Sequence, residues 1–449
     1  MRQLLSDTAA RAARYVTDIR DRSVVPNAQA LAQLKGLGGS LPLAPTAPEE
    51  VIALLDENGS RATMASTGGR YFGFVTGGTL PAALAANWLA GAWDQNAAVQ
   101  VMSPVAARLE EIVLGWMLEL LGLPAASGGG FVTGTTAANF SALAAARSAL
   151  LTRQGWDVEE RGLFGAPTIR VVVSDEVHLS VLKALQMLGL GRARVERVAT
   201  DEQGRLRATQ LPTLDANTIV CIQAGNVNTG SFDPAEEICE RARSAGAWVH
   251  VDGAFGLWAA ISPKYAQLLH GVGAADSWAI DCHKWLNVPY DSGAAFVRDA
   301  AHLRRAMTTV AAYIPASQQR DPWLYTPEAS RRARGIELWA AIKSMGRSGL
   351  CEIVERNCRQ ATAIAAGLRS ARFEILNDVV LNQVLVSFGT TEQTERVISG
   401  VQADGTCWCG ATRWHGNAAM RISVSSWATT DEDIERSVAA ITRVARAQR

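Results

Sequence analysis

Short apolar runs and amphipathic stretches alternate along the middle of the chain, from about residue 61 to 310. Two stretches, 103–121 and 233–245, carry apolar side chains at helical spacing and predict helices. Because the apolar runs between such stretches are short and hydrophobic throughout, they predict a mostly parallel sheet covered by helices on both faces. The strands that we expect lie at 169–174, 218–224, 247–252, 277–281 and 294–297.

The start of the chain has a different pattern. The first 60 or so residues predict one or two helices and a connector rich in proline and glycine at 36–48. A helix is expected to begin at Pro48, because proline there precedes Glu49 and Glu50 in the first turn. So short a leading unit buries little surface by itself, and we expect it to pack on the main body or on a second subunit.

The C-terminal part begins with a polar and aromatic loop at 311–329, of a length that is usually functional or mobile. A helix is predicted over 331–345, followed by helices and strands, among them 384–388 and 419–424. The predicted fold class is therefore α/β, with a large domain and a small C-terminal α/β domain. The division that we expect is 1–60, 61–315, and 316–449 with the loop included.

The amino-acid composition indicates which kinds of binding partner and which cellular compartment to expect. Lys and Arg together number 43, as do Asp and Glu, and this balance argues against nucleic acid or an anionic membrane as the main partner. Neither a signal peptide nor 18 uninterrupted apolar residues stand out. The seven cysteines are scattered without the paired spacing of a zinc site, so we expect no metal and a reducing, cytoplasmic location.

Lys284 has the most unusual surroundings of any candidate residue. The chain has only five lysines, and this one lies between His283 and Trp285, just after an apolar strand. A lysine so placed is suited to become a neutral amine and form a Schiff base. Asp252, 32 residues upstream, ends another strand, where its carboxylate could pair with a ring nitrogen. Together they suggest pyridoxal 5′-phosphate chemistry, although each alone also suits an ordinary surface charge.

Two further features add possible ligand contacts. The stretch 128–139 runs from a glycine-rich strand into an alanine-rich helix, whose N-terminal amides can bind an anion. Thr135 and Thr136 add hydroxyl donors, and no Gly-Lys-Ser/Thr follows as in a nucleotide P-loop. His178 follows a predicted strand, where ligands bind in α/β sheets. Taken singly, both features also suit a purely structural role.

Five segments, in this order, resemble the group II pyridoxal-phosphate-dependent amino-acid decarboxylases. They are T-G-T-T-A-A-N (133–139), D-E-V-H (175–178), N-T-G-S-F-D (228–233), H-V-D-G-A-F-G (250–256) and D-C-H-K-W (281–285). The resemblance covers about 70–430. It implies the aspartate-aminotransferase-like fold type I, with a seven-stranded sheet, a pyridoxal 5′-phosphate cofactor and a homodimer. The implied activity is decarboxylation of an L-amino acid to its amine and CO₂.

The resemblance also implies roles for the matching residues. Lys284 corresponds to the Schiff-base lysine, Asp252 to the acid that pairs with the pyridine nitrogen, and His178 to the histidine stacked on the ring. The other implied cofactor contacts are Thr135, Thr136 and His283 at the phosphate, Ala254 beneath the ring, and Thr229 near the cofactor.

Substrate contacts are expected from residues outside these motifs. Arg421 lies in a predicted strand, and its guanidinium suits bidentate recognition of a carboxylate, a structural salt bridge being the alternative. Tyr71 and Phe72 resemble the aromatic segment near the family's substrate entrance, with core packing as the alternative. The family's loop tyrosine, which donates a proton, has Tyr313 and Tyr325 as candidates, and neither aligns by motif.

Two departures leave the outcome of the reaction open. Asp281-Cys282 stands where many aromatic-amino-acid decarboxylases have Asn-Pro, and acid-bearing versions resemble other branches, including carbon–carbon lyases. The loop tyrosine is not identified. An aldehyde-forming or carbon–carbon lyase is therefore the alternative activity, and a non-catalytic pyridoxal-phosphate-binding protein is the remote one. The sequence does not specify which amino acid is the substrate.

Overall fold

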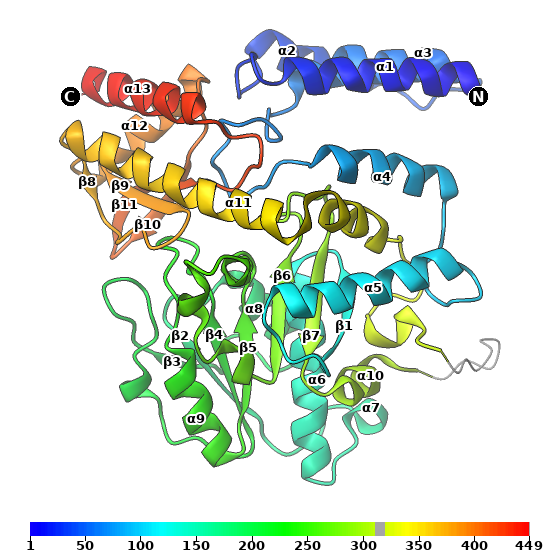
Figure 1. The fold of residues 1–449 in the computed structure, drawn as a ribbon, viewed down its shortest axis with the longest axis vertical. Helices are drawn as coiled ribbons and strands as arrows, with labels where there is room; N and C mark the ends of the chain where they lie inside the picture. The colour runs from blue at the N-terminus through cyan, green and yellow to red at the C-terminus, as the bar shows by residue number, and fades with distance from the viewer. Residues whose placement is uncertain (310–318, 449) are drawn as a thin grey trace. The chain divides into compact units, whose positions relative to one another are not determined.

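The computed structural model describes residues 1–309 and 319–448, and the chain falls into two compact units. Each unit is assembled from segments that are distant in sequence, as the colours of Figure 1 show. The smaller comprises Met1–Gly78, Thr362–Leu376 and Val384–Arg449, and the larger comprises Thr79–Ala361 and Asn377–Gln383. The three-part division expected from the sequence follows other boundaries and stays a prediction.

The larger unit is built on a seven-stranded sheet with the order β1-β7-β6-β5-β4-β2-β3. Four of its pairings are parallel, namely β6-β5, β5-β4, β4-β2 and β2-β3. β7 is antiparallel to both β1 and β6, so β1 runs in the same direction as the parallel strands. The strands are β1 (Gly128–Val132), β2 (Arg170–Ser174), β3 (Glu196–Val198), β4 (Thr218–Gln223), β5 (Trp248–Asp252), β6 (Ser277–Asp281) and β7 (Gly293–Val297).

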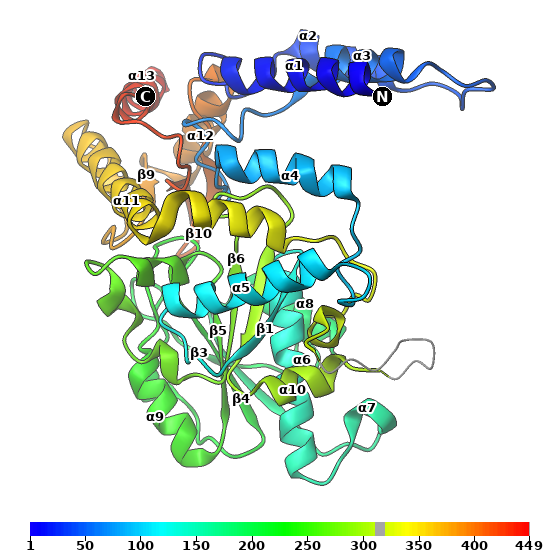
Figure 2. The same ribbon diagram turned by 45° about the vertical axis from the view of Figure 1, so that its right-hand side comes forward.

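Helices enclose this sheet (Figures 1 and 2). Every residue of β4, β5, β6 and β7 is buried, as expected where both faces are covered. The helices are α4 (Pro81–Trp93), α5 (Pro104–Leu120), α6 (Thr135–Arg153), α7 (Val158–Arg161), α8 (Leu179–Met187), α9 (Ala235–Ala245), α10 (Ala300–Met307) and the first part of α11 (Gly335–Ser370). Short 3-10 turns are η3 (Ala208–Gln210), η4 (Gly256–Ile261), η5 (Ala266–Leu269), η6 (Val272–Ala274) and η7 (Pro322–Tyr325).

The helices begin where the sequence supplies capping groups. The Ser103 side chain accepts a hydrogen bond from the Ala106 amide, and Pro104 occupies the first turn of α5. His178 caps α8 by accepting from the Ser180 amide. His178, a candidate site residue, is therefore also the N-cap of α8.

The smaller unit has a four-stranded sheet with the order β10-β11-β9-β8, in which β10-β11 and β8-β9 are antiparallel. Arg70 joins its distant segments by donating hydrogen bonds to the carbonyls of Arg20, Arg22 and Thr406. The elements are α1 (Arg2–Asp18), α2 (Ala28–Gln33), η1 (Leu34–Leu37), α3 (Pro48–Gly59), η2 (Ser60–Ala62), the end of α11, β8 (Glu374–Ile375), β9 (Gln383–Ser387), α12 (Thr391–Asp404), β10 (Gly410–Trp414), β11 (Asn417–Ser423) and α13 (Asp431–Ala447).

The elements expected from the apolar pattern are confirmed, with small shifts at their ends. The helix expected over 331–345 differs most, because α11 begins at Gly335 and continues to Ser370 through a non-helical residue, Gly346 (φ 59°). No described helix is long and apolar enough to cross a membrane. Within the same residues, no group of three His, Cys, Asp or Glu side chains is placed to hold a metal ion.

Candidate active site

Most of the candidate residues of the larger unit lie at one edge of the seven-stranded sheet. β1, β2, β5 and β6 run in the same direction, so their carboxyl ends share that edge. Thr135 follows β1 and His178 follows β2, while Asp252 and Asp281 are the last residues of β5 and β6. Ligands bind at this edge in open α/β sheets.

Lys284 is paired with a buried carboxylate. Its Nζ lies 2.9 Å from Oδ2 of Asp281, which is 3% exposed. The other carboxylate oxygen, Oδ1, accepts a hydrogen bond of 2.6 Å from the Thr135 amide at the start of α6. Trp258 also holds Asp281, because its Nε1 donates a hydrogen bond of 2.9 Å to the backbone carbonyl of Asp281. Asp281 thus connects the candidate lysine to the N-terminus of α6.

The charge state of Asp281 follows from these contacts. Burial alone would raise the pKa of its carboxyl, but the positive charge of Lys284, the nearby His283 ring and the hydrogen bonds from Lys284 and Thr135 outweigh it, so the pKa lies below its usual value. An ionised carboxylate is therefore kept beside Lys284.

His283 is fixed as a neutral imidazole. Its Nδ1 accepts a hydrogen bond of 3.0 Å from the Ser292 amide, so the ring proton is on Nε2, which lies 3.5 Å from Oδ1 of Asp281. Burial lowers the pKa of His283, only partly opposed by Asp281. The ring stacks on Tyr290 with 4.1 Å between centroids. His283 therefore presents an N–H donor.

Asp252 is held by uncharged donors. Its Oδ2 accepts hydrogen bonds of 3.1 Å from Asn139 Nδ2 and 3.1 Å from Ser180 Oγ, and its Oδ1 accepts from the Ala254 amide at 3.2 Å. His178 joins this group, because its Nδ1 lies 2.7 Å from Ser180 Oγ. Three sequence candidates are thus connected, Ala254 to Asp252 directly and His178 to Asp252 through Ser180.

The start of α6 has unused capacity for an anion. The Thr135 Oγ1 is buried and has no hydrogen-bond partner among the described residues. Thr136 follows it in the first turn of the helix. A Cβ added at Gly134 would lie 3.0 Å from His283 Cε1 and 3.1 Å from Asp281 Oδ1, so only glycine leaves this space open. The helix N-terminus, one unsatisfied hydroxyl and the His283 ring are therefore gathered in one place.

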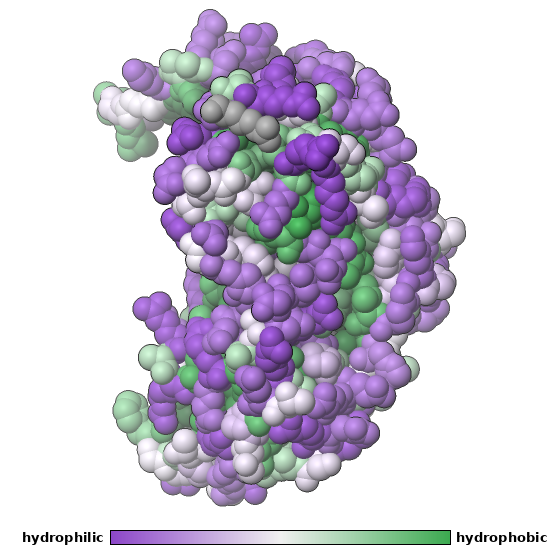
Figure 3. Space-filling model, turned by 90° about the vertical axis from the view of Figure 1, so that its left-hand side faces the viewer, coloured by the Kyte–Doolittle hydropathy of each residue, from purple (hydrophilic) through white to green (hydrophobic). Residues whose placement is uncertain are grey.

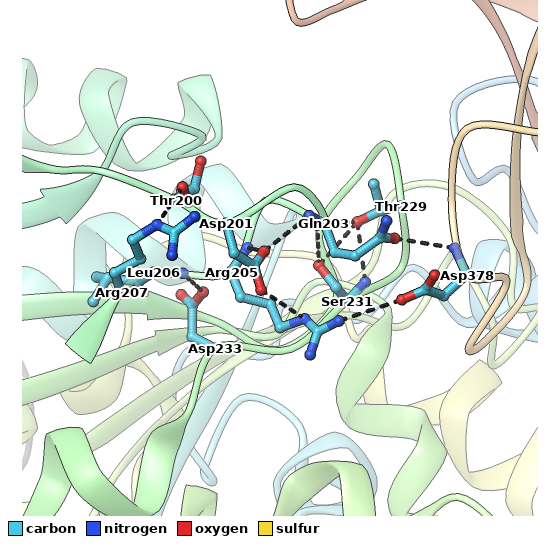
Figure 4. Close-up of polar contacts among 10 residues, drawn as sticks. All are labelled: Thr200, Asp201, Gln203, Arg205, Leu206, Arg207, Thr229, Ser231, Asp233 and Asp378. Atoms are coloured by element: carbon cyan, nitrogen blue, oxygen red, sulfur yellow. Dashed lines mark hydrogen bonds and ion pairs between the residues drawn. The ribbon is translucent and has the colours of Figure 1, made fainter. Parts of the chain in front are cut away.

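Thr229 has a different setting from the other candidates. Its Oγ1 donates to the Gln203 carbonyl at 2.7 Å and contacts Ser231 Oγ at 2.9 Å. Figure 4 shows these contacts within a network of loops that also holds Arg205 between Asp201 and Asp378. The Thr229 hydroxyl thus anchors a loop, and its role toward a cofactor stays a prediction.

The expected substrate residues Arg421, Tyr71 and Phe72 belong to the smaller unit. Arg421 lies in β11, burial lowers the pKa of its guanidinium, and its Nε is buried without a hydrogen-bond partner among the described residues. Tyr71 stacks on Trp408 at 5.0 Å between centroids, and Phe72 is buried. Tyr71 and Phe72 therefore pack within that unit, and their role toward a substrate stays a prediction, whereas Arg421 retains an unsatisfied donor.

The two loop tyrosines have different outcomes. Tyr325 lies in η7, packs against the core formed by α6, α8 and α10, and carries the Arg320 guanidinium 4.4 Å above its ring. Tyr313 lies outside the described residues. Neither tyrosine is thereby identified as a proton donor.

Residues 49–390 match the pyridoxal-dependent decarboxylase conserved domain. The chain belongs to this family. The fold type I, the pyridoxal 5′-phosphate cofactor and the carboxy-lyase class predicted from the sequence are thereby confirmed.

Similar proteins differ in the substrates that their names indicate. The aromatic-L-amino-acid decarboxylase of Bacillus atrophaeus is 26% identical over 88% of this chain and 85% of its own. The acidic amino acid decarboxylase of Mus musculus is 32% identical over 64% of this chain and 54% of its own. The structure of Oryza sativa TDC with PLP and tryptamine superposes with a TM-score of 0.91 at 23% identity, covering 99% of this chain and 97% of the other. This last likeness shows the fold.

Sequence reasoning missed several polar residues around the candidates. Asn139, Ser180 and His250 form hydrogen bonds around Asp252, and Asp281 was noticed only as a departure from a motif. One available signal was the alternation of Trp248, His250 and Asp252 in β5, which places polar side chains on one face of a buried strand.

Proposed function

We propose that this enzyme removes CO₂ from an L-amino acid and releases the amine, with Lys284 as the residue that carries the cofactor. The observation that supports this most strongly is the environment of Lys284. Its amine lies at the carboxyl edge of the sheet, ion-paired to a buried carboxylate that also accepts from the first amide of α6. Because Lys284 is only partly exposed and has a fixed partner, it differs from a solvated surface lysine.

The residues at this edge fit pyridoxal 5′-phosphate. Thr135, Thr136 and the Nε2 donor of His283 would hold the phosphate, for which the unpartnered Oγ1 of Thr135 is suited. Asp252 would accept from the ring nitrogen, while Ala254 and His178, which are connected to Asp252 directly and through Ser180, would contact the ring. Thr229 would lie nearby. When bound, the cofactor supplies an electron-accepting ring that stabilises negative charge on the substrate.

The protein's own groups then control protons and orientation. Asp252, a carboxylate at the strand end, would hold a proton on the ring nitrogen. His178 would limit movement of the ring and exclude water from that face. Lys284 would carry the cofactor, and Asp281, 2.9 Å from its Nζ, would orient the lysine side chain.

Substrate recognition is proposed for the residues that the family resemblance indicates. Arg421 would bind the α-carboxylate, because its buried Nε has no partner among the described residues. Tyr71, Phe72 and Tyr325 are proposed to shape the surroundings of the substrate. The relatives indicate aromatic and acidic amino acids, so a panel of both classes is the appropriate first screen.

We also propose a homodimer located in the cytoplasm. Leu89, Trp88 and Trp93 of α4 are 52%, 46% and 45% exposed, which is unusual for large apolar side chains on one helix. The face in Figure 3 is mostly hydrophilic, with apolar areas between its polar side chains. None of the seven cysteines, all of them among the described residues, forms a disulfide, which suits a reducing compartment. Sedimentation should give a dimer that Leu89→Glu weakens, whereas Phe164→Glu, at an exposed loop residue, should not.

Product analysis tests the proposed reaction. The purified protein with pyridoxal 5′-phosphate is offered common L-amino acids, and CO₂ and amine are measured. Lys284→Ala should abolish both products, whereas the control Lys183→Ala, at an exposed lysine on α8, should retain them. Aldehyde in place of amine would support the alternative activity. Absence of CO₂ from every amino acid would contradict the proposal.

A further inference from the structure

We infer that Asn139 and His250 are positioning residues that orient Asp252 through a one-way chain of hydrogen bonds. The inference rests on the proposed role of Asp252 at the cofactor ring and adds residues that act through it. Asn139 and His250 are both completely buried, and Asp252 is 5% exposed. A polar group buried this deeply lowers stability unless it forms a hydrogen bond, so we expect each of these side chains to have a defined partner.

The chain connects a helix and two strands. Trp248, His250 and Asp252 alternate in β5 and therefore present their side chains on the same face. Asn139 reaches this face from α6, which begins at Thr135. Ser277, the first residue of β6, contributes a hydroxyl. These residues are up to 138 positions apart, so the chain exists only when α6 is packed on the sheet.

The direction of the first two hydrogen bonds follows from chemistry. A carboxylate only accepts, so Asn139 must donate to Asp252 through Nδ2, at 3.1 Å. The Asn139 carbonyl Oδ1 then faces Nε2 of His250 at 2.9 Å. An amide oxygen also only accepts, so His250 must carry its proton on Nε2.

The remaining bonds agree with this assignment. With its proton on Nε2, His250 accepts through Nδ1, and Ser277 Oγ lies 2.9 Å away as the donor. The Ser277 oxygen in turn accepts from Trp248 Nε1 at 2.9 Å. Burial lowers the pKa of His250 to about 4, which keeps the ring neutral and preserves one donor and one acceptor. Each donor in the chain therefore meets an acceptor.

The chain determines which oxygen of Asp252 is available. Asn139 and Ser180 both donate to Oδ2, whereas Oδ1 accepts only from the Ala254 amide among the contacts described. A carboxylate oxygen accepts two hydrogen bonds readily, so Oδ1 is the one with capacity for a ring N–H. Since His250 fixes the rotation of the Asn139 amide, and Asn139 fixes Oδ2, both residues orient Asp252 without contacting the cofactor.

The first experiment examines the chain without any cofactor. Nitrogen-15 NMR of the histidine rings in the full-length apoprotein should show His250 protonated on Nε2, with no titration above about pH 5. His250→Gln assigns the signal. A ring protonated only on Nδ1 would overturn the inference, because Asn139 would then have to present its oxygen to Asp252. A ring that becomes charged near pH 6.5 would also overturn it, because Nδ1 could then no longer accept from Ser277.

The second experiment reads the effect on the cofactor. Asn139→Asp has nearly the same shape but cannot donate, and it places a second carboxylate against Asp252. Retention of pyridoxal 5′-phosphate should fall by about 10- to 100-fold, as when an outer partner that orients a ligand is lost. His250→Phe should have a smaller effect, His250→Gln should restore part of it, and Ser277→Ala should have the smallest. The nitrogen-15 signal of the labelled cofactor ring should shift in the same order.

Val251→Ala is the matched control, because Val251 is buried in the same strand with its side chain on the opposite face. It should lower thermal stability. It should leave unchanged both cofactor retention and the visible absorption band of the bound cofactor. Folded His250→Phe and Asn139→Asp with wild-type retention, band and ring-nitrogen signal would overturn the inference. If the wild-type protein itself forms no visible band with pyridoxal 5′-phosphate, the proposed function fails instead.

Discussion

Asp252 and Asp281 are the same residue type at the ends of neighbouring parallel strands, yet their surroundings differ. Both are almost fully buried, at 5% and 3% exposure. The side chains that bind Asp252 are an amide and a hydroxyl, both uncharged. Asp281 has the Lys284 ammonium at 2.9 Å, in addition to the Thr135 amide. One carboxylate is therefore set in a neutral network, and the other in an ion pair.

This difference indicates different roles. The neutral partners of Asp252 leave its charge uncompensated within the described residues, so it is available to pair with a cationic ring nitrogen. The charge of Asp281 is already matched by Lys284, so its role is to hold that lysine and the start of α6. Burial at a strand end thus does not by itself define function; the partners do.

The largest expected effect comes from comparing the two isosteric variants Asp252→Asn and Asp281→Asn. We expect Asp252→Asn to lower kcat/KM by about 10²- to 10³-fold, as when one preorganised electrostatic group is removed. Asp281→Asn should lower it less, by roughly 10-fold, because an amide oxygen can still accept from Thr135. Steady-state decarboxylation assays measure both. Equal losses, or the reverse order, would show that the two carboxylates do not differ as described.

The stability of the apoprotein in acid tests the neutral network around Asp252, which includes His250. His250 has a folded pKa of about 4, below the ordinary 6.5, so the unfolded chain binds more protons between these values. Stability linked to His250 is therefore complete above pH 6.5 and is lost as pH falls to 4, by about 3 kcal/mol. Urea unfolding should show a shallower loss in His250→Gln, since glutamine does not titrate and the nearby Asp252 only partly opposes the effect of burial on the pKa of His250. Parallel pH curves would contradict a buried neutral His250.

Asp281 should affect the free energy of unfolding in a more acidic pH range than His250 does. The pKa of Asp281 is lowered in the folded apoprotein, so its contribution is present above the unfolded value near 4 and is lost as pH falls below it. Lys284, His283 and Cys282 are the titratable groups closest to it. Asp281→Asn should therefore change the stability curve only below about pH 4, as measured by urea unfolding. A difference confined to pH 5–7 would assign the acid response to another group.

The smallest effect is expected at Thr135. Its buried Oγ1 has no partner among the described residues, so Thr135→Val should change the free energy of unfolding of the apoprotein by no more than about 0.5 kcal/mol. Retention of pyridoxal 5′-phosphate should nevertheless weaken severalfold. Thr229→Val is the comparison, because it loses a hydrogen bond to Gln203 and should cost about 1 kcal/mol. A larger stability loss at Thr135 would mean that its hydroxyl is already satisfied.

The strand-end residues could be predicted from sequence because they depend on local pattern. An apolar run followed by Asp252, or by His283 and Lys284, identifies both a strand and the residue at its carboxyl end. Parallel strands then bring those ends to one edge, as the structure shows for β5 and β6. Family resemblance supplied the cofactor and the reaction class.

The partners of those residues could not be predicted in the same way. Asn139 meets Asp252 across 113 positions, and His250 meets Ser277 across 27. These contacts depend on how α6 docks on the sheet and on side-chain rotamers, neither of which hydrophobic periodicity specifies. The ion pair of Lys284 with Asp281, only three positions apart, was within reach, but its significance depends on burial that becomes visible only in the folded chain.

Mapping the covalent attachment of the cofactor tests the central claim most directly. The full-length protein is saturated with pyridoxal 5′-phosphate, reduced with borohydride, digested and examined by peptide mass spectrometry. The account predicts stoichiometric labelling of the peptide that contains Lys284, and none on those with Lys35, Lys183, Lys264 or Lys343. Stoichiometric labelling of another lysine, or no labelling of Lys284, would contradict it.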